Sequence, residues 1–169
     1  LFVTQGSANA VRKTTDGTTF SNHTFNADFV AVREGTTTAQ VLAYVYQNSS
    51  VCTLVPGGTD ENKVIGYAGS TATNLVSFAN ALWIGKPEGL YRWAAGHTGD
   101  AAFFAAGEFY STNNCTKMAV HNNILYFNIG NRLYYTNGQA GVIGRVEPSE
   151  INGFESLDCL AATAGPLLF

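Results

Sequence analysis

The 169-residue chain contains 46% apolar and 12% charged residues and carries a formal net charge of −3 at pH 7. Its frequent aromatic side chains and small net charge exclude an intrinsically disordered chain. Its scattered basic residues exclude a nucleic-acid-binding surface, and the lack of any run of 18 apolar residues excludes a transmembrane helix.

Short β-rich runs separated by turn residues recur along the whole chain. Abundant Gly, Thr and Asn favour pleated strands joined by tight turns. Four hairpins are predicted, in chain order: Leu1–Thr4 with Ala10–Lys13, Ala43–Tyr46 with Val51–Leu54, Asn80–Gly85 with Gly89–Trp93, and Asn123–Asn128 with Asn131–Tyr135. The sequence therefore predicts an all-β protein.

The third and fourth hairpins are copies of one repeat. Four pairs of residues are each separated by 43 positions: Leu82 and Leu125, Trp83 and Tyr126, Leu90 and Leu133, Tyr91 and Tyr134. The aromatic residue of the first hairpin strand recurs as Phe2, Tyr44, Trp83, Tyr126 and Phe169, with separations of 42, 39, 43 and 43. This spacing is typical of the four-stranded blade of a β-propeller.

Each repeat extends to four strands. The runs expected to precede the hairpins are Phe29–Val32, Leu75–Phe78, Met118–Val120 and Cys159–Ala162, and those expected to follow them are Lys63–Gly66, Ala101–Ala106 and Gly141–Val146. An insertion at Thr36–Thr38 lengthens the first turn of the second repeat.

The prediction is a β-propeller, or consecutive blades of one, with about four repeats of roughly 42 residues. A β-sandwich is the alternative, because it also alternates aromatic residues with turns. Residues 1–169 form a single repeat region, expected to be part of a longer chain. A closed four-bladed ring and an arc of a larger ring both fit, and the larger ring is favoured.

Two segments resemble known propeller motifs. Leu82–Arg92 is similar to the blade motif of the two-component-regulator type of propeller, in which a Leu-Trp-Ile-Gly strand turns into Leu-Tyr-Arg. Arg12–Phe20 resembles the Asp-box turn of sialidase-like propellers, but Thr14 replaces Ser, one residue is missing before Gly17, and Phe20 replaces Trp. Both motifs imply blades, and neither implies a catalytic residue.

In composition the chain is also similar to propellers of bacteriophage tail hubs and nozzles. That resemblance implies a structural or receptor-binding module of a virion or another extracellular assembly, acting by loop display and by contacts with other protein subunits. A carbohydrate-binding or sialidase-like propeller is the alternative, and a sensor-type ligand-binding propeller is a third. A sialidase needs an arginine cluster, whereas the arginines are spread over different repeats: Arg12, Arg33, Arg92, Arg132 and Arg145.

No catalytic, cofactor-binding or metal site is predicted, and an enzyme is the less favoured class. The histidines (His23, His97 and His121) lack ligand spacing, and the acidic residues are expected in solvated connections: Asp60, Glu61, Glu147, Glu150, Glu155 and Asp158. The cysteines (Cys52, Cys115 and Cys159) are expected to be small buried side chains. Three glycosylation sequons begin at Asn22, Asn48 and Asn114, and they do not decide the compartment because such triplets arise by chance in an Asn- and Thr-rich chain.

Overall fold

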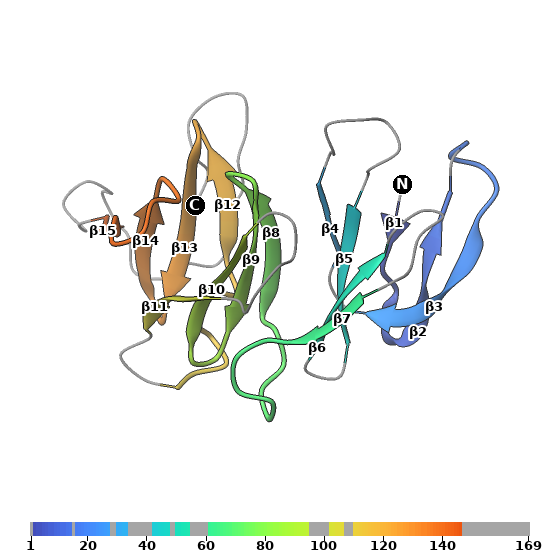
Figure 1. Ribbon diagram of the computed structural model, residues 1–169, viewed down its shortest axis with the longest axis horizontal. Helices are drawn as coiled ribbons and strands as arrows, with labels where there is room; N and C mark the ends of the chain where they lie inside the picture. The colour runs from blue at the N-terminus through green and yellow to red at the C-terminus, as the bar shows by residue number, and fades with distance from the viewer. Residues whose placement is uncertain are drawn as a thin grey trace. The chain divides into compact units, whose positions relative to one another are not determined.

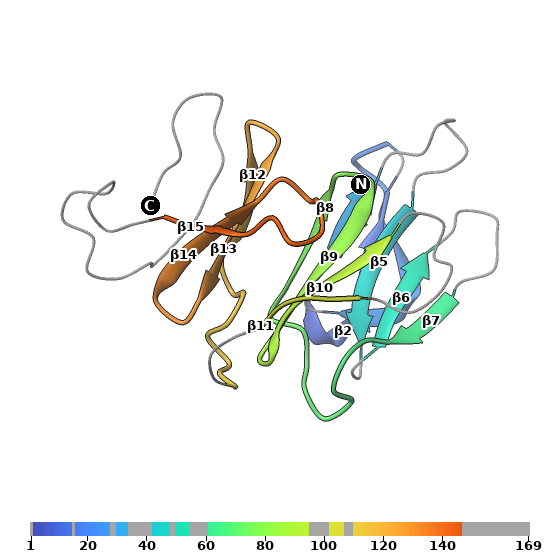
Figure 2. The ribbon, with the colours of Figure 1, turned by 60° about the vertical axis from the view of Figure 1, so that its left-hand side comes forward.

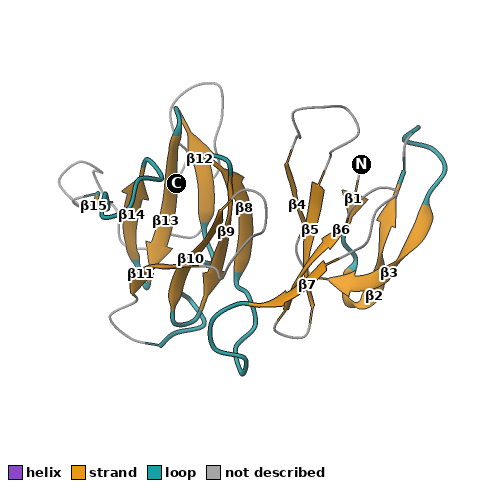
Figure 3. Cartoon of the chain, viewed as in Figure 1, coloured by secondary structure: helices purple, strands orange, loops and turns teal. Residues whose placement is uncertain are grey.

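The computed structural model describes residues 2–14, 16–27, 30–33, 42–47, 50–54, 61–94, 102–106 and 110–146. Every regular element within these ranges is a β-strand (Figure 3). No helix formed by these residues has the length and apolarity needed to cross a membrane. The all-β class predicted from the sequence is confirmed.

The chain divides into two compact units, Leu1–Thr71 and Ala72–Phe169. The first unit contains two antiparallel sheets. Its strands are β1 (Phe2–Val3), β2 (Gly6–Lys13) and β3 (Ser21–Ala27) in the first sheet, and β4 (Val30–Arg33), β5 (Leu42–Gln47), β6 (Ser50–Leu54) and β7 (Glu61–Val64) in the second. The strands of each sheet are hydrogen-bonded in chain order, and β3 lies against β5.

The second unit also contains two sheets, each with four strands in chain order (Figure 1). The strands are β8 (Asn74–Phe78), β9 (Ala81–Lys86), β10 (Gly89–Ala94) and β11 (Ala102–Ala106) in the third sheet, and β12 (Met118–His121), β13 (Ile124–Ile129), β14 (Arg132–Thr136) and β15 (Gly144–Arg145) in the fourth. Strands β8 and β12 lie side by side, and Figure 2 shows the two sheets next to each other.

The 43-residue repeat is a repeat of strand register. In the third sheet Trp83 pairs with Val76 on one side and with Arg92 on the other. In the fourth sheet Tyr126 pairs with Ala119 and Tyr135, each 43 positions later. Residues 43 positions apart therefore occupy equivalent places on two successive sheets.

The four predicted hairpins are all present, as β1–β2, β5–β6, β9–β10 and β13–β14. Eight residues separate β4 from β5, whereas two separate β8 from β9. This difference matches the predicted insertion near Thr36–Thr38, which itself lies outside the described residues, as do Cys159–Ala162 and Phe169.

Two of the predicted fourth strands begin at other positions. Strand β7 starts at Glu61, two residues before the predicted start, because Glu61–Val64 completes the register with β6. Strand β15 is shorter than the run predicted for it, because only Gly144 and Arg145 pair with β14. The prediction of Glu61 in a loop was therefore wrong.

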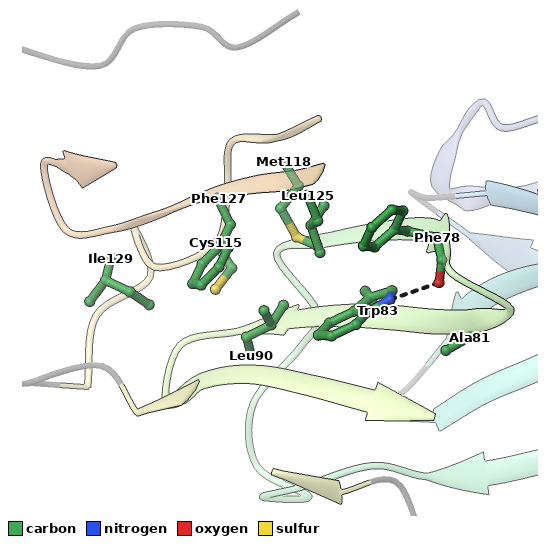
Figure 4. Packing of buried hydrophobic residues seen from close by; sticks show 9 residues of the cluster. All are labelled: Phe78, Ala81, Trp83, Leu90, Cys115, Met118, Leu125, Phe127 and Ile129. Atoms are coloured by element: carbon green, nitrogen blue, oxygen red, sulfur yellow. Dashed lines mark hydrogen bonds between the residues drawn. The ribbon is translucent and has the colours of Figure 1, made fainter. Parts of the chain in front are cut away.

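A hydrophobic core fills the space between the third and fourth sheets (Figure 4). Its buried members are Phe78, Ala81, Trp83, Leu90, Cys115, Met118, Leu125, Phe127 and Ile129. The indole of Trp83 is completely buried and donates a 2.9 Å hydrogen bond to the Phe78 carbonyl. Residues alternate between the two faces of a strand. The face of β9 that contains Ala81 and Trp83 and the face of β13 that contains Phe127 therefore supply this core.

The tight turns β8–β9 and β12–β13 require left-handed backbone. Ala79 and Asn80 have φ of 47° and 57°, and their counterparts Asn122 and Asn123 have φ of 47° and 59°. Positive φ at both central residues defines the type I′ turn that matches the twist of a hairpin. Asn tolerates this region well, whereas Ala does not.

We therefore expect Ala79→Asn to raise the free energy of unfolding of the second unit by about 1 kcal/mol. The measurement is denaturant unfolding followed by tryptophan fluorescence, which reports on this unit because both tryptophans, Trp83 and Trp93, lie in it. The exposed Ala140, whose φ is not positive, is the control, and Ala140→Asn should be neutral. Equal effects of the two changes would contradict the strain argument.

Candidate functional site

Polar side chains gather at one end of the second unit. In an antiparallel sheet with strands in chain order, the β9–β10 turn lies at the same end as the entry to β8 and the exit from β11. The β13–β14 turn and the connection 110–117 between β11 and β12 share this end. We call the β9–β10 turn, the β13–β14 turn and the connection 110–117 together the connection end, and they hold the candidate site.

A lysine, a glutamate and a tyrosine meet at the β9–β10 turn. Lys86 is completely buried, and its Nζ lies 3.4 Å from Oε1 of Glu88. The hydroxyl of Tyr91 donates to the same Oε1 over 3.3 Å. Burial lowers the pKa of Lys86 from its ordinary value while Glu88 opposes the shift, and burial followed by Glu88 raises the pKa of Tyr91.

This cluster departs from the repeat. The counterpart of Lys86, 43 positions later, is Ile129, which is buried in the core. The fold therefore accepts an apolar residue at this place, and the ion pair is particular to the third sheet. Since the Lys86 side chain has no exposed surface, the cluster orders the turn around Glu88 and does not present a free amine to solvent.

The buried lysine predicts a pH dependence of stability. Its pKa is lower in the folded than in the unfolded chain, so the unfolded chain binds more protons as pH rises toward 10.5. In that window the wild type should gain stability relative to Lys86→Met. Urea unfolding of both proteins at increasing alkaline pH measures the difference, and a constant or shrinking difference would contradict the burial argument.

Asn114 joins the two hairpin turns of the connection end. Its Nδ2 donates to the Pro87 carbonyl over 2.7 Å, and its Oδ1 accepts from the Gly130 amide over 2.9 Å. Its backbone carbonyl accepts from Thr73 Oγ1 over 2.7 Å. The side chain is buried. The side chain of Asn114 is therefore engaged in hydrogen bonds within the fold, and a glycan attached at this sequon is incompatible with this fold.

Replacing Asn114 by Ala should lower the free energy of unfolding of the second unit by about 2 kcal/mol, because the buried Pro87 carbonyl loses its donor and the Gly130 amide loses its acceptor. Asn113 offers a matched control, since its side chain is exposed and only its backbone accepts hydrogen bonds here. Tryptophan-detected unfolding of both variants measures the effect. Similar losses for Asn113→Ala and Asn114→Ala would show that the bridge contributes little.

Cys115 is a buried free thiol in the same connection. Burial raises its pKa to about 12, and a hydrogen bond from the backbone of Lys86 only partly opposes this shift. The thiol therefore stays protonated and does not act as a nucleophile. The predicted role as a small buried side chain is confirmed for this cysteine, whereas the Cys52 side chain and Cys159 lie outside the described part of the structure.

The Asp-box-like segment forms the turn between β2 and β3 in the first unit. The carboxylate of Asp16 accepts from the amides of Thr19 and Thr18 over 2.8 and 2.9 Å, and from Thr14 Oγ1 over 2.8 Å. These bonds, with that of Thr19 the largest, hold the pKa of Asp16 well below its ordinary value. Arg12 lies over the Phe20 ring at 5.2 Å. The segment therefore orders a turn, as the resemblance implied.

The other residues weighed in the sequence do not form a cluster in the described structure. Within the described ranges, no three His, Cys, Asp or Glu side chains are placed to hold a metal ion. His121 is half-buried in β12. Several candidates lie outside the described residues or side chains: His23, His97, Arg33, Asp60, the Glu61 side chain, Glu147, Glu150, Glu155 and Asp158.

The arginines of the second unit occupy separate places in the repeat. Arg92 lies over the Trp83 ring at 5.9 Å, on the face of the third sheet that meets the fourth. Arg132 begins β14 and is exposed, and Arg145 is exposed on β15. Arg145 pairs with Tyr134, two residues after Arg132, whereas Arg92 lies on the other sheet of this unit.

Comparison with known proteins identifies the fold. No protein-family model and no curated protein matches the sequence. Solved structures that match it include selenomethionine-substituted virginiamycin B lyase from Staphylococcus aureus (TM-score 0.71, 18% identity), a streptogramin B lyase (0.74, 15%), and a catalytically inactive virginiamycin B lyase from Staphylococcus aureus with quinupristin (0.70, 16%). The chain has the fold of a β-propeller.

Each match covers 97% of this chain but only 55–56% of the solved structure. The chain thus spans just over half the length of the propellers it resembles. The predicted choice of a propeller over a sandwich is confirmed. Identities of 15–18% carry the fold alone, and the activities of those lyases are not transferred with it.

Proposed function

We propose that the chain is a structural or receptor-binding propeller module of a virion or another extracellular assembly, and that it acts by displaying loops and by contacting other protein subunits. One observation supports this most directly. Large apolar side chains are exposed among the described residues of both units, and they are Val3, Val64, Tyr67, Tyr110, Tyr135, Val142 and Ile143.

These side chains belong to a chain with only 12% charged residues. The cores of protein interfaces are enriched in Tyr and depleted in Lys, Glu and Asp, and three of the seven exposed large apolar side chains are tyrosines. The packed core between the third and fourth sheets gives the exposed connections a rigid support, as recognition by loops requires. The compositional resemblance to tail hubs and nozzles places the virion first among such assemblies.

The test is to find where the native protein resides. Native material is fractionated by sedimentation, and the chain is identified by intact mass in the particle and soluble fractions. The proposal expects the protein in particles at a fixed ratio to another structural protein. A native protein found only in the soluble fraction, with no associated subunit, would overturn it.

Glycan binding is a second candidate, supported by a repeated tyrosine. Tyr67 and Tyr110 are 43 positions apart, follow the last strand of their sheets, and are 65% and 61% exposed. Exposed aromatic rings at repeated positions are suited to stacking on sugar rings. A glycan array with the wild type and Tyr110→Ala tests this candidate. Binding that is lost with Tyr110 supports it, and an array without binding excludes it for the glycans present.

A further inference from the structure

The junction of the third and fourth sheets shows how two successive sheets of this repeat pack against each other. On the third sheet the cross-strand pair Trp83 and Arg92 faces the fourth. On the fourth sheet the pair Phe127 and Tyr134, with rings stacked at 5.9 Å, faces back. A junction therefore combines two different faces of the repeat.

The fourth sheet carries a second copy of the face that contains Trp83 and Arg92 in the third sheet. Tyr126 and Tyr135 pair across β13 and β14 at the positions of Trp83 and Arg92, and their ring centroids are 6.2 Å apart. Tyr135 is 37% exposed, and Val142, just before β15, is 40% exposed. We call the Tyr126–Tyr135 side of the fourth sheet the tyrosine face.

The first sheet carries a second copy of the face that contains Phe127 and Tyr134 in the fourth sheet. Phe2 occupies the position of Tyr126 in the repeat, so Val3 and its partner Arg12 occupy those of Phe127 and Tyr134. Val3 is 36% exposed, and the Arg12 guanidinium lies on an aromatic ring. We call the Val3–Arg12 side of the first sheet the valine face.

We infer that a second copy of this chain packs its valine face on the tyrosine face, and so repeats between copies the junction of the third and fourth sheets. This names a partner for the assembly role proposed above and rests on that proposal. Arg and Tyr are favoured at interface cores, and an arginine that stacks on aromatic rings suits a face of two tyrosines. The contact is heterologous, because two different faces of the repeat meet.

The test is light scattering coupled to size exclusion over a concentration series of the 169-residue chain. The expected mass is twice that of one chain, which is 18.0 kDa. Tyr135→Glu and Val3→Glu should each weaken self-association at least tenfold, which corresponds to about 1.4 kcal/mol. Tyr110→Glu and Val64→Glu are matched controls, because they place the same charge at exposed Tyr and Val side chains outside both faces.

Mixing the variants tests the pairing of faces. The Tyr135→Glu copy keeps an intact valine face and the Val3→Glu copy keeps an intact tyrosine face, so the mixture should regain a dimer through one junction. A monomeric wild type, or a dimer that neither variant weakens more than its control, would overturn the inference. A monomer whose native form still sediments in particles would overturn this inference alone and leave the proposed function standing.

Discussion

Replacing Trp83 by Ala is expected to lower the free energy of unfolding of the second unit by about 3–5 kcal/mol. The indole is completely buried between the third and fourth sheets, and its ring lies 6.2 Å from that of Phe78. The change leaves a cavity, removes the donor to the Phe78 carbonyl, and takes away the ring beneath Arg92. Because one substitution causes all three losses, the decrease in the free energy of unfolding should exceed that of an ordinary surface substitution.

Denaturant unfolding followed by Trp93 fluorescence measures this effect, because Trp93 lies in the same unit and remains in the variant. Tyr126→Ala is the matched control at the equivalent position of the repeat, where the side chain is only half-buried. It should cost less than half as much. A loss for Trp83→Ala as small as that of an ordinary surface change would show that the junction contributes little to the stability of the unit.

The repeat was predictable because it is a property of single side chains. An aromatic residue stands at the same position of the first hairpin strand in both sheets, so Trp83 and Tyr126 recur with the spacing of the backbone register. The insertion in the second sheet was predictable for the same reason, because it shifts only the first strand relative to the hairpin. These signals lie in local sequence and need no knowledge of tertiary contacts.

The bridge at the connection end was not predictable in this way. Asn114 acts through Pro87 and Gly130, which are 27 and 16 positions away. Nothing in the local sequence distinguishes it from the other asparagines in turns. The buried Lys86 carried a signal that could have been used, since its counterpart in the repeat is the apolar Ile129.

Function was less predictable than fold, because the repeat constrains the scaffold and leaves the connections free. The face that builds a junction inside the chain, with Trp83, is the same type of face that is left exposed at Tyr135. In a protein built from such units, the same face can pack against the next sheet of the chain or against another subunit. This equivalence connects the repeat found in the sequence with the assembly role proposed for the protein.

Gly85→Ala is expected to lower the free energy of unfolding of the second unit by about 3 kcal/mol, at the upper end of the usual cost of overpacking. A Cβ at this position would lie 2.6 Å from Cys115 Cβ, 2.7 Å from the Cys115 carbonyl oxygen and 2.9 Å from Thr73 Oγ1. The carbonyl oxygen belongs to the backbone, so the clash cannot be relieved by a rotamer change. Cys115 also has φ of 53°, which leaves its backbone little freedom to move.

The equivalent position of the fourth sheet shows why the third sheet needs glycine here. There Asn128 accepts from the Lys117 amide over 2.8 Å and donates to the carbonyls of Asn113 and Gly130. The Asn128 side chain thus bonds to the connection 110–117, the same segment whose Cys115 lies over Gly85. The preference for glycine at position 85 comes from the close approach of this connection.

Tryptophan-detected unfolding of Gly85→Ala measures the cost, and the double variant Gly85→Ala with Cys115→Gly separates its causes. Removing the Cys115 side chain relieves the contact with Cβ and suits the positive φ, but it leaves the carbonyl oxygen in place. The double variant should thus recover part of the lost stability and not all of it. Full recovery would assign the clash to the side chain alone, and a single variant as stable as the wild type would mean that the connection moves away from β9 at little cost.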